Sequence, residues 1–214
     1  MKRTLGWTAA LVTLTLAGGA VDARAAIIFN NFGPGDDFAN GGRVVDGGGA
    51  PGSIGNIDQA ASFTVGATDQ MADTISLGIW VNEAPNVGTG PVDIVLAADT
   101  GAGPGAALKT YSANLNSTGK QLLTVSGDPV PLDANTTYWV VMDAQDEFRG
   151  SWNFNTTGDF GLTAGRTDLN PWNLRPDDQR YSLRVEGPAV PEPASLAVLG
   201  MGAMLVAGRR RRRC

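Results

Sequence analysis

Clusters of carboxylates are the side chains of this sequence best suited to metal binding or acid–base chemistry. Three clusters stand out: Asp36-Asp37, Asp143 with Asp146-Glu147, and Asp177-Asp178. Clustered carboxylate oxygens suit Ca²⁺, and two carboxyl groups on either side of a glycosidic bond can act as acid and base. Solvated acidic turns give the same pattern, and the sequence has neither an EF-hand spacing nor a Gly-Gly-x-Gly-x-Asp repeat. We therefore keep calcium at Asp36 and Asp37 as a hypothesis, expect no other cofactor and assign no catalytic residue.

Tryptophan side chains could supply a platform for a sugar ring, because indole joins an apolar face to a polar N–H. Trp139 lies inside an apolar strand pattern, so burial in the core explains it. Trp80 lies opposite the apolar face of its strand, and Trp172 lies in the polar segment 170–173. Core packing is the competing explanation for both, but Trp80 and Trp172 are the better carbohydrate-binding candidates.

The composition excludes several function classes. The sequence contains no histidine, and its one cysteine is the final residue, Cys214. Nucleophile systems that depend on histidine and ordinary His-ligated metal sites are therefore excluded. Between residues 26 and 190 there are nineteen acidic and eight basic residues, a net charge of −11. Such a surface repels polyanions, so we expect no nucleic-acid partner.

The N-terminal segment has the order of a secretory signal peptide. Lys2 and Arg3 precede an apolar run over residues 5–21, and Ala23 and Ala25 occupy the −3 and −1 positions of a cleavage site. A retained membrane anchor is the alternative, but small residues in the run and the cleavage site argue against it. We expect signal peptidase to remove residues 1–25.

The C-terminal segment, residues 189–214, has three parts in order. Pro191, Glu192 and Pro193 are followed by the apolar stretch 194–208 and then by five arginines: Arg209, Arg210, Arg211, Arg212 and Arg213. Fifteen helical residues span about 22 Å, and local thinning can offset the shortfall against a hydrocarbon core of about 30 Å. A terminal arginine run cannot enter a protein core, and it keeps its side of the segment cytoplasmic. The pattern therefore predicts a single transmembrane helix with a stop-transfer cluster.

These three parts resemble the PEP-CTERM sorting signal in order and spacing. Val190-Pro191-Glu192-Pro193 is followed by Ala-Ser-Leu-Ala-Val-Leu-Gly, and the arginine cluster follows after a short span. The resemblance implies that a membrane-embedded exosortase recognises the tripeptide and cuts near it. It also implies a precursor tethered to the inner membrane, then delivery to the outer surface or extracellular matrix of a Gram-negative-type bacterium. Exosortase systems accompany exopolysaccharide production, so exopolysaccharide is the expected partner. Cys214 has no role in this pattern.

Residues 26–188, called the body here, combine strand patterns of period two with turn residues. The predicted strands are Ala61–Val65, Thr74–Val81, Val92–Leu96, Leu108–Ala113, Gln121–Ser126, Thr137–Met142, Ser151–Asn155 and Tyr181–Val185. Gly127-Asp128-Pro129 and Asn170-Pro171 are typical of turns that end strands, and Asn40–Asn56 is typical of a long surface loop. The pattern predicts an all-β domain, a β-sandwich with jelly-roll topology, with a barrel as the alternative.

The body also resembles the choice-of-anchor surface domains, most closely the R type. The segments that carry the resemblance are Phe32–Asp36, Ala61–Gly66 and Leu132–Trp139. The resemblance implies a surface location and a β architecture. It implies no activity and transfers no catalytic residue.

Three hypotheses of function follow from these patterns. The first is a non-enzymatic surface or extracellular-matrix protein associated with exopolysaccharide. The second is a carbohydrate-binding module of the cell envelope, which requires exposed aromatic side chains on one sheet or rim. The third is a glycan hydrolase, which requires two carboxylates converging in a cleft. We favour the first, because the sequence specifies targeting clearly and chemistry poorly.

Overall fold

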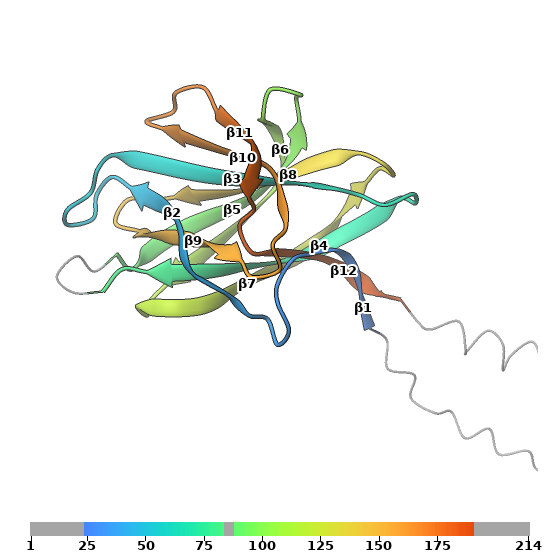
Figure 1. Cartoon of the computed structure of the whole chain (residues 1–214), viewed down its shortest axis with the longest axis horizontal. Coiled ribbons are helices and arrows are strands. Elements are labelled where there is room, and N and C mark those ends of the chain that lie inside the picture. Colours follow the sequence, from blue (N-terminus) through green and yellow to red (C-terminus); the bar gives the residue numbers. More distant parts are fainter. Residues whose placement is uncertain (1–23, 84–87, 191–214) are drawn as a thin grey trace, which may run out of the picture. The chain divides into compact units, whose positions relative to one another are not determined.

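The computed structural model describes residues 24–83 and 88–190 (Figure 1). Within these ranges all regular secondary structure is β, and Ala25–Val190 forms one compact unit. The strands are β1 (Arg24–Asn30), β2 (Phe38–Gly47), β3 (Asn56–Thr64), β4 (Gln70–Val81), β5 (Gly90–Asp99), β6 (Pro104–Leu115), β7 (Gly119–Leu132), β8 (Thr137–Ala144), β9 (Arg149–Asn155), β10 (Phe160–Thr167), β11 (Asn173–Gln179) and β12 (Leu183–Val190).

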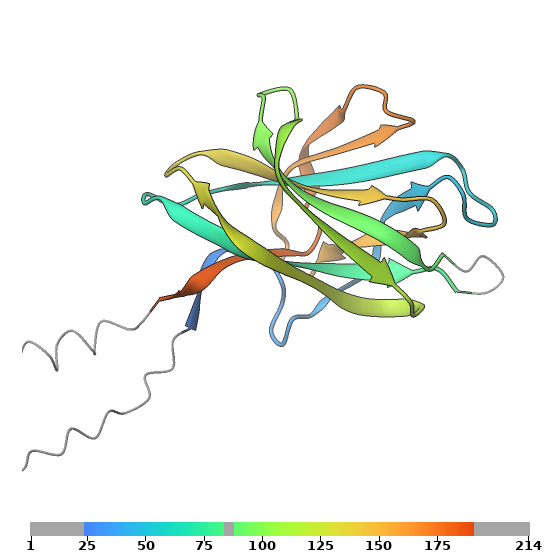
Figure 2. The ribbon, with the colours of Figure 1, turned by 180° about the vertical axis from the view of Figure 1, so that it is seen from behind.

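One curled antiparallel sheet contains all the strands. Along the sheet the order is β1-β12-β4-β9-β2-β3-β8-β5-β6, while β7 pairs with β4, and β10 pairs with both β3 and β11. The curvature is visible from both sides of the molecule (Figures 1 and 2). It brings β6 and β7 together around a common core, to which Tyr111 and Leu115 contribute from β6 and Leu123 and Val125 from β7.

The alternation of β4 directs its apolar side chains into this core. Ile75, Leu77, Ile79 and Val81 are fully buried and pack with Phe63, Trp152 and other residues of the same cluster. Full burial of one such side chain stabilises the fold by about 1.5–3 kcal/mol. The prediction of a strand with one apolar face over Thr74–Val81 is confirmed.

The two faces of β8 contribute to two different clusters. Tyr138, Val140 and Met142 join the main core, whereas Trp139 and Val141 form a smaller cluster on the opposite face. The β10–β11 hairpin covers this opposite face, and Figure 1 shows it beside the β5–β6 turn. The predicted alternation of Thr137–Met142 and the burial of Trp139 are therefore confirmed. We call this face of β5, β8, β3 and β10 the outer face.

The prediction of a long loop over Asn40–Asn56 is wrong for the first half of this segment, which belongs to β2. Val44 pairs with Ser151 of β9, and Gly47 pairs with Asn56 of β3. A Cβ atom at Gly42 would overlap the carbonyl oxygen of Trp152, so glycine here permits close packing rather than a loop.

The prediction that a turn at Gly127-Asp128-Pro129 ends a strand is also wrong, because β7 continues through these residues. A register shift opposite Ala72 and Thr74 of β4 absorbs the irregularity. The last strand of the body was predicted to begin at Tyr181. β12 begins instead at Leu183, and Tyr181 makes only an isolated bridge with Phe154. β1, β10 and β11 were not predicted.

The fold class is thus confirmed as all-β, and the curled sheet fits a β-sandwich. The jelly-roll topology stays a prediction. The predicted transmembrane helix falls within residues 191–214, outside the described residues. In the described ranges, no helix is long and apolar enough to cross a membrane.

Candidate functional site

An ion pair on the outer face joins β3 and β10. The register pairs Asp58 of β3 with Arg166 of β10, and the Arg166 Nε donates to the Asp58 Oδ2 over 2.6 Å. Asp58 is 1% exposed. A buried carboxylate of this kind requires a charged partner, and Arg166 provides it.

Asp143 of β8 lies beside Asp58 on the same face. The register that pairs Gln59 with Met142 places these two carboxyl groups opposite each other, close enough for a hydrogen bond once one of them is protonated. Burial, and then the negative charge of Asp58, raise the pKa of Asp143 to about 6. The Asp58 Oδ1 is buried and, with both groups ionised, meets no donor among the described residues. Below about pH 6 a proton on Asp143 supplies that donor, so under these conditions the pair shares one proton.

A pocket of about 260 Å³, called the outer pocket here, opens beside this pair. Its lining residues are Val95, Ala97, Pro104, Gly105, Ala107, Val141, Asp143, Arg166 and Trp172. The Arg166 guanidinium lies 4.5 Å from the ring centroid of Trp172, a cation–π contact. Trp172 is half-buried and also packs in the smaller cluster. Its indole is therefore held in place beside a carboxyl group and a guanidinium group.

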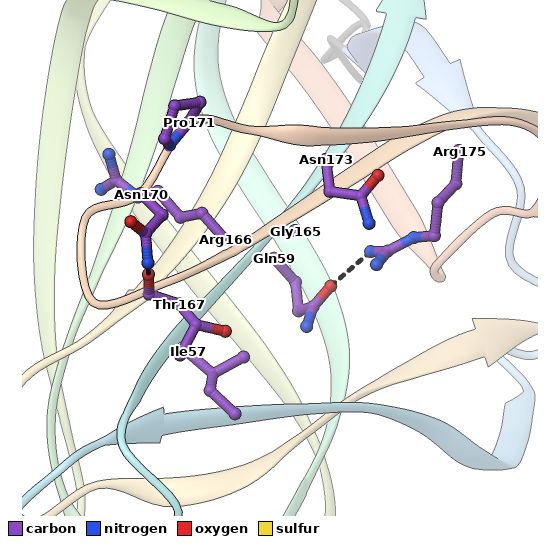
Figure 3. A pocket seen from close by; sticks show the side chains of 9 residues that line it. All are labelled: Ile57, Gln59, Gly165, Arg166, Thr167, Asn170, Pro171, Asn173 and Arg175. Atoms are coloured by element: carbon purple, nitrogen blue, oxygen red, sulfur yellow. Dashed lines mark hydrogen bonds between the residues drawn. The ribbon is translucent and has the colours of Figure 1, made fainter.

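A second pocket of about 310 Å³, called the hairpin pocket here, is formed by β3, β10 and β11 (Figure 3). Its lining residues are Ile57, Gln59, Gly165, Arg166, Thr167, Asn170, Pro171, Asn173 and Arg175. The Arg175 Nη2 donates to the Gln59 Oε1 over 2.6 Å, and the Asn170 Nδ2 donates to the Thr167 carbonyl over 2.7 Å. Amide, hydroxyl and guanidinium groups thus dominate this pocket, and Arg166 lines both pockets.

The structure separates the two tryptophans predicted to bind carbohydrate. Trp80 is half-buried in β4, where it pairs with Lys120 of β7 and Ser151 of β9. Trp172 precedes β11 and lines the outer pocket. Trp80 lines neither the outer nor the hairpin pocket, so a platform made of both side chains does not form.

The carboxylates of Asp36 and Asp37 face basic side chains. Asp36 has a left-handed backbone (φ 61°) and accepts a hydrogen bond from Arg184. Asp37 lies 3.5 Å from the Lys120 Nζ. Across residues 24–83 and 88–190, no three acidic, cysteine or histidine side chains form a group that could hold a metal ion. Calcium at Asp36 and Asp37 stays a prediction.

The residues that sequence reasoning missed are Asp58, Gln59, Arg166 and Arg175. Asp58 and Gln59 precede the predicted strand Ala61–Val65 and continue its alternation, a signal that could have extended the strand. Arg166 and Arg175 lie on two unpredicted strands. The alternation of Phe160, Leu162 and Ala164 is a signal that could have marked β10, whereas β11 has no such signal.

The predicted cleavage and sorting residues lie at the edges of the described chain or beyond them. Ala25 is in β1, whereas Ala23, Pro191, Glu192, Pro193 and Arg209 to Arg213 fall outside the described residues. No curated protein matches the chain. Residues 189–213 match the family described as the PEP-CTERM protein-sorting motif. The motif implies an exported protein that an exosortase processes at the membrane.

Proposed function

We propose that this chain is an exosortase-sorted, non-enzymatic surface or extracellular-matrix protein that associates with exopolysaccharide by binding carbohydrate in the outer pocket. In this proposal signal peptidase and exosortase act during export. The precursor is held in the inner membrane by its tail, and the mature protein reaches the outer surface or matrix of a Gram-negative-type bacterium. The body is a choice-of-anchor domain of the R type with jelly-roll topology. The sorting motif at residues 189–213 supports the export part of the proposal.

The position of Trp172 in the outer pocket carries the binding part. A sugar ring has an apolar face that packs on indole and hydroxyl groups at its edge that need hydrogen-bond partners. Trp172 offers the indole, while Asp143 and Arg166 line the same pocket. The packing of Trp172 in the smaller cluster fixes its ring before a ligand arrives, which lowers the entropic cost of binding.

The geometry of the carboxyl pair favours binding over hydrolysis. Glycosidases hold their two carboxyl groups about 5–5.5 Å apart when retaining and about 6.5–9.5 Å apart when inverting. Asp58 and Asp143 are neighbours across the β3–β8 register, and Asp58 is buried against Arg166. A sugar cannot enter between them, so this pair supports the non-enzymatic proposal over the glycan hydrolase alternative.

Binding of the purified full chain to a polysaccharide array tests the proposal. Trp172→Ala should weaken binding about tenfold or more, because a buried aromatic contact often accounts for more than about 1.4 kcal/mol of binding energy. Trp80→Ala is the matched control, since Trp80 is also half-buried but lies outside the pocket. Equal losses in the two variants, or release of reducing ends from a bound glycan, would contradict the proposal.

A further inference from the structure

The hairpin pocket is positively charged in an otherwise acidic body. Arg166 and Arg175 line it, and the described residues that line it include no carboxylate. The sequence between residues 26 and 190 has nineteen acidic residues against eight basic ones. A pocket with two guanidinium groups and no acid is therefore unexpected on this surface, and it favours an anionic ligand.

Arg175 shares its nearest carboxylate with a second arginine. The Asp178 carboxylate lies 2.9 Å from the Arg43 Nη2 and 3.5 Å from the Arg175 Nε, so it forms ion pairs with two guanidinium groups. Asp58 forms an ion pair with Arg166 over 2.6 Å. Arg43 and Arg175 thus share one carboxylate, and Arg175, whose contact with it is the longer, lines the pocket.

The Arg175 guanidinium is fixed, and its Nη1 nitrogen is free among the described residues. Its Nη2 donates to the Gln59 Oε1 over 2.6 Å and to the Tyr181 hydroxyl over 2.9 Å. Gln59 is only 5% exposed and donates its own amide to the Val44 carbonyl. A Cβ atom at Gly165 would lie 2.9 Å from both Nη1 and Nη2, so the guanidinium lies across this glycine. Among the described residues, Nη1 has no hydrogen-bond acceptor.

Polar groups around this free nitrogen suit a sugar. Figure 3 shows the Asn173 side chain beside the Arg175 guanidinium, with Thr167 and Asn170 on the other side of the pocket. The two N–H groups of Nη1 can donate charge-assisted hydrogen bonds to a carboxylate, while amide and hydroxyl groups match sugar hydroxyls. We propose that the hairpin pocket binds the carboxylate of an acidic sugar unit. This inference rests on the proposed function, because it assigns a ligand class to the same glycan.

The test compares binding of the full chain to polygalacturonate and to the same polymer after its carboxyl groups have been reduced to alcohols. Arg175→Gln should weaken binding of polygalacturonate about tenfold or more, because it removes charge-assisted hydrogen bonds. Binding of the reduced polymer should not change. Arg180→Gln is the matched control, because Arg180 pairs with Asp159 and does not line the pocket.

A second variant avoids the contacts that Arg175 makes inside the fold. Asn173 is exposed, so Asn173→Asp places a negative charge at the pocket without removing a packed side chain. It should lower affinity for polygalacturonate several-fold, whereas the exposed control Asn114→Asp on β6 should not.

The possible results separate the two proposals. Equal binding of the two polymers by the parent chain, or equal losses in Asn173→Asp and Asn114→Asp, would overturn the acidic-sugar assignment. Glycan binding that depends on Trp172 would then remain. Absence of binding to any polysaccharide on the array would overturn the proposed function and this assignment with it.

Discussion

At the residue scale, Asp143 makes the stability of the fold depend on pH. Burial and the charge of Asp58 raise the pKa of Asp143 from 3.8 to about 6. Between about pH 4 and 6 the folded protein therefore holds a proton that the unfolded chain has released. Stability gained from this proton is fully present below about pH 4 and is lost as the pH rises through about 6.

Asp143→Asn should remove this part of the pH dependence. The asparagine amide can donate to the Asp58 Oδ1 at every pH. As the pH rises from about 5 to about 7.5, the free energy of unfolding of the parent should therefore fall by about 1–2 kcal/mol relative to that of the variant, allowing for partial solvent screening. Urea unfolding at both pH values measures the difference. Asp128→Asn is the control, because the Asp128 side chain is fully exposed. An Asp143→Asn variant whose stability falls with pH as steeply as that of the parent would contradict the assignment.

At the scale of strands, the sequence predicted those elements whose alternation the core requires. β4 and β8 have apolar side chains at every second position, and their faces are those expected. β11 lacks this pattern, and in β10 it is limited to Phe160, Leu162 and Ala164, so tertiary contacts are needed to hold both strands in place. Arg166 of β10 pairs with the buried Asp58, and Trp172 and Leu174 cover the Trp139 cluster. The outer pocket depends on this hairpin, so only Trp172 and Asp143 among its polar and aromatic groups were candidates in advance.

The glycines within residues 40–47 were misread for a related reason, since glycine occurs both in loops and where strands pack closely, as Gly78 does. Gly78 lies in the middle of β4, where a Cβ atom would overlap the Phe38 ring and the Ser182 Oγ. The Gly78 amide also donates to that hydroxyl over 3.1 Å. Gly78 is thus the point at which β4, the start of β2 and the residue preceding β12 meet.

Gly78→Ala should destabilise the fold by about 1–3 kcal/mol, the usual cost of overpacking a well-packed site. Gly66→Ala is the matched control, because no atom lies within 4 Å of its added Cβ and its φ is not positive. That variant should be neutral or slightly stabilised, since alanine restricts the unfolded chain. Chemical unfolding of both variants gives the comparison. Equal stabilities would show that Phe38 and Ser182 can move aside without cost.

At the scale of the whole molecule, folding and delivery depend on different parts of the chain. Every residue of the two core clusters lies between Ile28 and Val185, whereas the sorting motif matches residues 189–213. The charge is divided in the same way. The body is acidic, and five of the last six residues are arginine. Substitutions in the motif should therefore alter delivery and leave the stability of the body unchanged.

The last prediction follows from the different roles of Glu192 and the arginines. Glu192 lies between two prolines, which favour an extended backbone that an exosortase can bind, so Glu192→Ala should leave uncut precursor in the membrane. The arginines resist crossing the bilayer, so replacing Arg209 to Arg213 with glutamine should misplace the apolar segment or let it pass through. Fractionation with an antibody to the body distinguishes these outcomes. Glu186→Ala, outside the matched motif, is the control. Normal maturation of both variants would contradict the assigned roles of Glu192 and the arginines.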